Sequence, residues 1–110
     1  MRTNVMVNSR ICDTLALLVL CKRMNGEKET IRSLVDKAVD EQRDFFEQLE
    51  IKSVNGEKRC VAVGVEQVNA IKEANVGSIA GVVTACVLQF VRKAERGSAK
   101  FKKLVEVLRS

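Results

Sequence analysis

The chain has 110 residues, of which 46% are hydrophobic, and this fits one domain or two very small halves that share a core. Four Phe with no Trp or Tyr predict an aliphatic core, and the absence of proline favours long helices over a many-stranded sheet. The chain has no histidine and its four cysteines show no CxxC spacing, which excludes a mixed cysteine–histidine zinc site, so we expect neither a metal nor a cofactor.

Charge is distributed unevenly along the chain. The net charge is +5, yet residues 1–50 hold eight basic and nine acidic side chains, whereas residues 51–110 hold eleven basic and five acidic ones. Six of the eleven fall in the segment RKAERGSAKFKK at 92–103: Arg92, Lys93, Arg96, Lys100, Lys102 and Lys103. This basic segment favours a polyanion such as nucleic acid or an acidic protein segment, and a solvated helix face is the alternative interpretation.

Two apolar stretches bear on the location of the protein. The run LALLVLC at 15–21 is short, follows Asp13 and lacks the small-residue cleavage site of a secretory signal. The stretch 79–91 is too short to span a bilayer. The cysteines sit in apolar surroundings, as buried reduced thiols do. Together these features predict a soluble, cytoplasmic protein with no membrane partner.

The first predicted element is a strand over 2–8, RTNVMVN, in which Thr3, Val5 and Val7 alternate with residues that are mostly polar. A lone short strand with a polar face is not stable by itself. We therefore expect it to pair with its copy in another subunit, and an internal strand at 59–65 is the alternative partner.

Two helices are predicted after this strand. The first covers 10–24 and is apolar on nearly every side, which implies that a partner subunit or a second half of the chain buries it. Gly26 supplies the left-handed residue that ends it. The second covers 28–49 and keeps apolar residues at helical spacing opposite a charged face, and we expect its Phe45 and Phe46 to pack in the core.

The second half of the chain begins with a hairpin signal. In IKSVNGEKRCVAVGV at 51–65, Asn55 and Gly56 stand between two strand-like runs, which predicts a β-hairpin. Three helices are expected after it, at 66–75, at 79–96 and from Ser98 onward. Strand, helix, glycine and helix thus occur at 2–49 and more loosely at 59–96, so that an internal repeat is an open alternative.

The sequence gives little support for catalysis. It has no nucleophile elbow, no P-loop, no Gly-rich dinucleotide loop and no histidine to act as a base. Carboxylates lie mostly on the charged face of the second helix, at the spacing of ion pairs such as Lys37 with Glu41. We expect that the protein is not an enzyme.

The N-terminal pattern resembles the ribbon-helix-helix family of DNA-binding proteins. The residues that carry this resemblance are RTNVMVNSRICDTLALLVLCKRMNGEKETIRSLVDKAVDE, at 2–41. Within the family, the spacing looks most like the accessory proteins of conjugative plasmid transfer, of the TraM type. The resemblance implies that two subunits pair their strands into an antiparallel ribbon that enters the major groove, where side chains on its outer face read base edges.

The resemblance also implies roles for individual residues. The inward strand positions match Val5 and Val7, and the turn glycine matches Gly26. The positions that read bases match Arg2, Asn4 and Met6, with Asn8 at the edge. The positions that bind phosphate, at the start of the second helix, match Lys28, Thr30 and Arg32. In such a ribbon Arg2 could bind guanine and Asn4 adenine, whereas Met6 could contact a thymine methyl group.

These observations predict a mainly α-helical, oligomeric protein with two regions. Residues 1–50 would form the ribbon-helix-helix region, and residues 51–110 a β-hairpin and a helical oligomerisation region that makes a dimer or tetramer. The function would be sequence-specific binding of double-stranded DNA, as a repressor or as an accessory factor at a plasmid or phage site. An assembly module whose basic segment 92–103 binds an acidic protein partner or nucleic acid is the alternative, and DNA binding through that segment is a third possibility.

Overall fold

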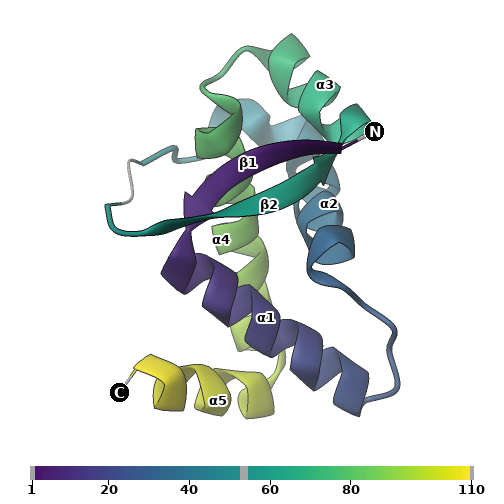
Figure 1. The fold of residues 1–110 in the computed structure, drawn as a ribbon, viewed down its shortest axis with the longest axis vertical. Coiled ribbons are helices and arrows are strands. Elements are labelled where there is room, and N and C mark those ends of the chain that lie inside the picture. Colours follow the sequence, from purple (N-terminus) through teal and green to yellow (C-terminus); the bar gives the residue numbers. More distant parts are fainter. Residues whose placement is uncertain (1, 53–54, 110) are drawn as a thin grey trace.

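The computed structural model describes residues 2–52 and 55–109, which fold into two paired strands carried on a layer of helices (Figure 1). In chain order the elements are β1 (Arg2–Asn8), α1 (Ser9–Met24), α2 (Ile31–Gln42), the 3-10 helix η1 (Arg43–Gln48), β2 (Lys58–Gly64), α3 (Val65–Ala74), α4 (Ile79–Gly97) and α5 (Ala99–Arg109). The prediction of a mainly helical protein with an N-terminal strand is confirmed.

The predicted partner of β1 is wrong, because β1 pairs with β2 of the same chain. The two strands run antiparallel, with Val5 opposite Val61 at the centre and Asn8 opposite Lys58 at one end. The alternative of an internal partner at 59–65 is therefore confirmed. Pairing within the chain is favoured because each strand lays two valines on the same helical layer, which buries the apolar side of both strands at once.

The predicted β-hairpin at 51–65 is also wrong for the residues that the structure describes. Residues 51–52 lie outside any strand, residues 53–54 fall outside the described part, and β2 forms its ladder with β1. Ile51 instead packs against the hydrophobic core, close to Gly77 and Gly81. The Asn55-Gly56 signal reports a local turn, and Gly56 does have a positive φ of 118°. Only a local pattern predicts a strand before that turn, and no ladder forms there in the described residues.

The order strand, helix, helix occurs twice, as β1–α1–α2 and as β2–α3–α4. Val5 and Val61 are equivalent positions, and because they face one another the register of the ribbon is symmetric. Both strands begin with three exposed residues, and both bury positions four, six and seven. The open alternative of a second strand–helix–helix copy at 59–96 thus agrees with the order of elements, the register and the burial of the strands.

The second helices of the two units begin in the same way. Thr30 caps α2 by accepting the N–H of Ser33, and Ser78 caps α4 by accepting the N–H of Gly81. Counting from these caps, equivalent buried positions are Leu34 and Val82, Val35 and Val83, Ala38 and Cys86, and Val39 and Val87. The capping of α2 at Thr30 explains why this helix begins at Ile31 and not at residue 28 as predicted.

The far end of the predicted 28–49 helix also differs. After Gln42 the chain tightens into η1, and Phe45 has non-helical angles (φ −125°, ψ 16°). Phe46 is buried as expected, but Phe45 is half exposed, so its predicted place in the core is wrong. A continuous helix would have placed both rings by its 3.6-residue period, and the change of period turns Phe45 outward.

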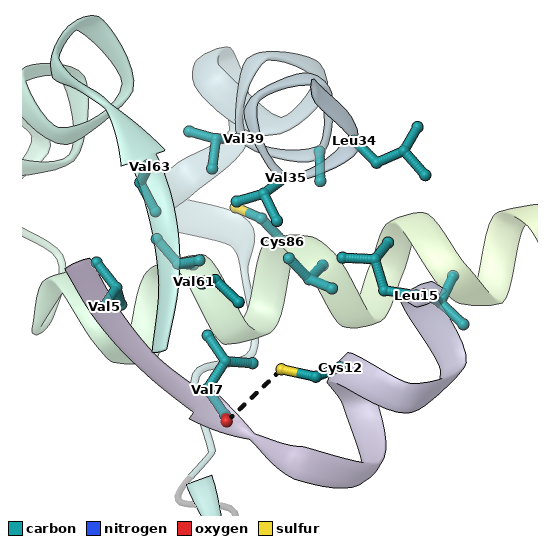
Figure 2. Close-up of a cluster of buried hydrophobic side chains, with 14 of the residues drawn as sticks. Val5, Val7, Cys12, Leu15, Leu34, Val35, Val39, Val61, Val63 and Cys86 are labelled. Carbon is teal, nitrogen blue, oxygen red and sulfur yellow. Dashed lines mark hydrogen bonds between the residues drawn. The ribbon is translucent and has the colours of Figure 1, made fainter. Parts of the chain in front are cut away.

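One hydrophobic core lies between the ribbon and the helices and draws on both halves of the chain (Figure 2). Val5, Val7, Val61 and Val63 of the ribbon meet Val35 and its neighbours in α2 and α4. The Cys12 thiol of α1 donates to the carbonyl oxygen of Val7 at 3.8 Å, which ties the start of α1 to the ribbon. On the opposite, outward side of the ribbon the residues Asn4, Met6, Lys58 and Cys60 are exposed.

The helices have limited apolar length. No single helix in the described residues is long and apolar enough to cross a membrane, and α3 and α4 would be so only when counted together across a bend of 108°. The predicted burial of the cysteines is confirmed for Cys12, Cys21 and Cys86, which are free thiols, and is wrong for Cys60, which is exposed.

Candidate nucleic-acid interface

The outer face of the ribbon is formed by alternate residues of β1 and β2, because the intervening valines point into the core. From one end of the ribbon to the other, the facing pairs on this side are Arg2–Gly64, Asn4–Ala62, Met6–Cys60 and Asn8–Lys58. We call these eight residues the outer face. Three of the residues predicted to read bases, Arg2, Asn4 and Met6, are exposed on it.

At one end of the outer face Arg2 is held by hydrogen bonds. One of its terminal nitrogens, Nη2, donates to Asp36 Oδ2 at 2.8 Å and to the carbonyl oxygen of Ala62 at 3.1 Å. The other oxygen of Asp36 accepts the backbone N–H of Gly64 at 3.0 Å. Asp36 therefore links α2 to both strands, and the guanidinium is poised at the rim of the ribbon with 32% of its side chain exposed.

The middle of the outer face carries one free amide and two sulfur atoms. The Asn4 side chain is exposed and makes no hydrogen bond within residues 2–52 and 55–109, so its donor and acceptor are both available to a ligand. Across the ribbon, the Cys60 thiol lies 3.4 Å from the Met6 sulfur, and Met6 is 46% exposed. These sulfur atoms form an apolar, deformable patch beside a polar one.

The structure gives Asn8 a capping position. Its side chain accepts the N–H groups of Arg10 and Ile11 at the start of α1 and donates to the carbonyl oxygen of Asn55. Only 6% of this residue is exposed. Since both ends of the amide are occupied by the chain, Asn8 is not among the residues that we propose to read bases.

A hollow of about 290 Å³ opens beside Asn8, between the ribbon and the start of α4. Its lining includes Lys52, Lys58, Ser78 and Thr84. Thr84 is the α4 residue that corresponds to Asp36 of α2, counted from the two N-caps. The first unit thus has a carboxylate where the second has a hydroxyl. Lys58 corresponds to Arg2, but the position equivalent to Asp36 offers it no carboxylate.

The predicted phosphate-binding residues lie at the start of α2. Lys28 and Arg32 are exposed, whereas the Thr30 hydroxyl takes part in the capping box with Ser33. Glu29 sits among them, and hydrogen bonds from Lys37 and Ser33 lower the pKa of its carboxyl group. The carboxylate therefore stays charged, and it partly neutralises the positive end of α2.

All six basic residues of the 92–103 segment are exposed: Arg92, Lys93, Arg96, Lys100, Lys102 and Lys103. They lie at the end of α4 and in the first half of α5. In Figure 1, α5 lies below α1, away from the ribbon. Lys93 lies 3.8 Å from Glu41, a weak ion pair between exposed groups. The structure therefore places this basic segment and the outer face on separate parts of the molecule.

The comparisons with known proteins add no family to this geometry. No protein-family model, curated protein or solved structure matches the chain. Within the described ranges, no group of three or more His, Cys, Asp or Glu side chains could hold a metal ion.

The residues that sequence reasoning missed are those of β2. The outer face is completed by four residues of β2, none of which the sequence pattern predicts as a site residue: Lys58, Cys60, Ala62 and Gly64. The signal was present, since Val61 and Val63 alternate with these residues as Val5 and Val7 alternate with theirs. The alternation predicts a strand at 59–65, but its outer face is small and apolar, unlike the polar face of 2–8, so the pattern alone predicts no base contacts there.

Proposed function

We propose that this protein binds double-stranded DNA by inserting the outer face of the β1–β2 ribbon into the major groove. The observation that carries the proposal is an exposed, antiparallel two-stranded ribbon whose outward side chains include Arg2 and Asn4. A major groove is wide enough for such a ribbon. The resemblance of 2–41 to the ribbon-helix-helix family supports the same function, with the second strand supplied by this chain itself.

The chemistry of the outer face suits base recognition. Arg2 Nη2 already donates to Asp36 and Ala62, so Arg2 would donate to guanine through its Nη1 and Nε N–H groups. The free amide of Asn4 can donate to and accept from adenine. Met6 and Cys60 can contact thymine methyl groups. Lys28 and Arg32 are exposed beside the start of α2, where they can bind phosphate. Bound at an operator the protein would act as a repressor, and bound at a plasmid or phage site it would act as an accessory factor.

The experiment is a binding assay on duplexes selected from a random pool. Arg2→Ala with Asn4→Ala should abolish the preference for the selected duplex over a scrambled one, and circular dichroism checks that loss of the Arg2–Asp36 ion pair leaves the fold intact. The matched control is Lys100→Ala, Lys102→Ala and Lys103→Ala, which removes more positive charge from α5 and should leave the preference intact. The proposal fails if the first variant keeps the preference of the parent.

A second candidate function rests on the basic segment. Its six exposed cations are accompanied within the segment by Glu95 alone among acidic residues, a charge pattern that suits an acidic protein segment or a nucleic-acid backbone. Under this alternative the α5 triple variant loses binding, and the Arg2 and Asn4 variant retains it. Absence of duplex binding at about 100 mM salt, where phosphate contacts still contribute, would favour the acidic protein partner.

A further inference from the structure

We infer that one copy of this chain recognises a non-palindromic DNA site and binds it in a fixed direction. This inference rests on the proposed function. A ribbon made by two identical chains would present the same side chains at both ends, whereas this ribbon joins two different strands of one chain.

The two ends of the outer face differ in chemistry. One end carries Arg2 and Asn4, and the residues opposite them are Gly64 and Ala62. Glycine and alanine leave room for the longer side chains to reach a base edge. This end can therefore read its half of the site through hydrogen bonds.

The other end carries Met6, Cys60 and Lys58. Neither sulfur side chain is a strong hydrogen-bonding group, so the contacts available there are apolar, together with one flexible ammonium. We expect that half of the site to present thymine methyl groups and a guanine or phosphate for Lys58. The two halves of a bound duplex would then differ in sequence.

The helix residues beside the two ends of the ribbon also differ. Asp36 binds Arg2 and fixes where its guanidinium lies, whereas Thr84 in the corresponding position leaves Lys58 without a carboxylate partner there. The Thr84 hydroxyl donates instead to the carbonyl oxygen of Ala80 within α4. A positioned Arg reads a base geometrically, and a mobile Lys contributes mainly charge. Sequence information is thus concentrated in the half of the site that faces Arg2 and Asn4.

The test combines selection from a random duplex pool with two matched variants and a measurement of stoichiometry. The parent should select a motif without inverted symmetry, and sedimentation should give one chain per duplex. Asn4→Ala should relax base preference by roughly tenfold in one half of the motif only, and Lys58→Ala should act on the other half only. As a further readout, a palindromic duplex built from either half alone should bind more weakly than the selected site.

Failures of the two proposals are distinguishable. An inverted-repeat motif, two chains per duplex, or equal effects of Asn4→Ala and Lys58→Ala on both halves would overturn the inference and leave DNA reading by the ribbon in place. A pool that shows no enrichment, or a motif that neither variant changes, would contradict both.

Discussion

The two strand–helix–helix units agree in what they bury and differ in what they expose. Each buries three positions of its strand in the same pattern, and α2 and α4 bury equivalent positions counted from their N-caps. On the outer face, by contrast, Arg2 corresponds to Lys58, Asn4 to Cys60 and Met6 to Ala62. The shared core requires apolar side chains at matching places, whereas exposed positions are free to differ.

The helices of the two units differ in length and in how many neighbours surround them. α1 has 16 residues and α3 has 10. α4 lies behind the ribbon in Figure 1 and contacts α1, α2, α3 and α5, so it is apolar on most sides, whereas α2 keeps a charged outer face. In the first unit α2 therefore places the charged Asp36 beside Arg2. In the second unit the start of α4, which lies beside Lys58, is mostly uncharged. Four predictions test how far the two units are equivalent.

The largest expected effect comes from placing a charge in the shared core. Val7→Asp in the first unit and Val63→Asp in the second should each lower the free energy of unfolding by about 4 kcal/mol or more, because an unpaired carboxylate would be buried. Val7 and Val63 are 1% and 0% exposed. Chemical denaturation measures the loss, with Thr3→Asp on the exposed part of β1 as the control. A large effect at one valine and a small one at the other would show that the units do not share one core.

The next prediction concerns a buried thiol of α4. Burial raises the pKa of Cys86 from 9.0 to about 12. The folded state thus holds this proton more tightly than the unfolded state, so its contribution to stability is complete below about pH 9 and is lost as the pH rises toward 12. Cys86→Ala copies the equivalent Ala38 of α2, and its unfolding free energy should fall less between about pH 8 and about pH 10.5 than that of the parent. Parallel urea titrations at the two pH values measure this, and equal falls would contradict the assignment.

A smaller effect is expected at the start of the first helix of each unit. Asn8 caps α1 through its side chain, whereas α3 begins after Gly64 with no side-chain cap. Asn8→Ala should lower the free energy of unfolding by about 1 kcal/mol. Asn8→Gly copies the second unit, and loss of the cap should then lower it by only a few tenths of a kcal/mol. Thermal denaturation of the two variants side by side measures the difference. If both variants are as stable as the parent, the capping hydrogen bonds of Asn8 contribute little.

The smallest effect is expected from Asp36. Asp36→Asn weakens the hold on Arg2 and removes one negative charge beside the ribbon, so affinity for any duplex should rise by roughly a few-fold, with less discrimination among sequences. Asp44→Asn, on η1, removes the same charge from a residue that does not bond to Arg2 and is the matched control. Fluorescence anisotropy with selected and scrambled duplexes measures both. Identical behaviour of the two variants would mean that the carboxylate acts through net charge and not by positioning Arg2.

Much of the local structure could be predicted from the sequence, because local periodicity determines it. The alternation at 2–8 gave β1, the helical spacing gave α1, and Gly26 has the expected positive φ of 84°. Contacts between residues that are far apart in the chain could not be predicted, because no local pattern indicates them. The contact between Arg2 and Asp36 joins positions far apart in the chain, and it depends on how α2 crosses behind the ribbon.

The errors have two physical sources. The β-hairpin was expected because Asn55 and Gly56 favour a turn, but the apolar face of β2 is buried only when it pairs with β1. The strand parity of Asn8 predicts a base-reading role, although an asparagine just before a helix is also the preferred N-cap. In both places a tertiary or capping interaction outweighed the simpler pattern.

The most direct test of the central claim is a nuclear magnetic resonance titration of the ¹⁵N-labelled chain with its selected duplex. If the outer face of one intramolecular ribbon enters the groove, the amide signals of Asn4, Met6, Cys60 and Ala62 should shift most, on both strands and at one chain per duplex. Shifts confined to residues 92–103, with both strands of the ribbon unchanged, would contradict the account.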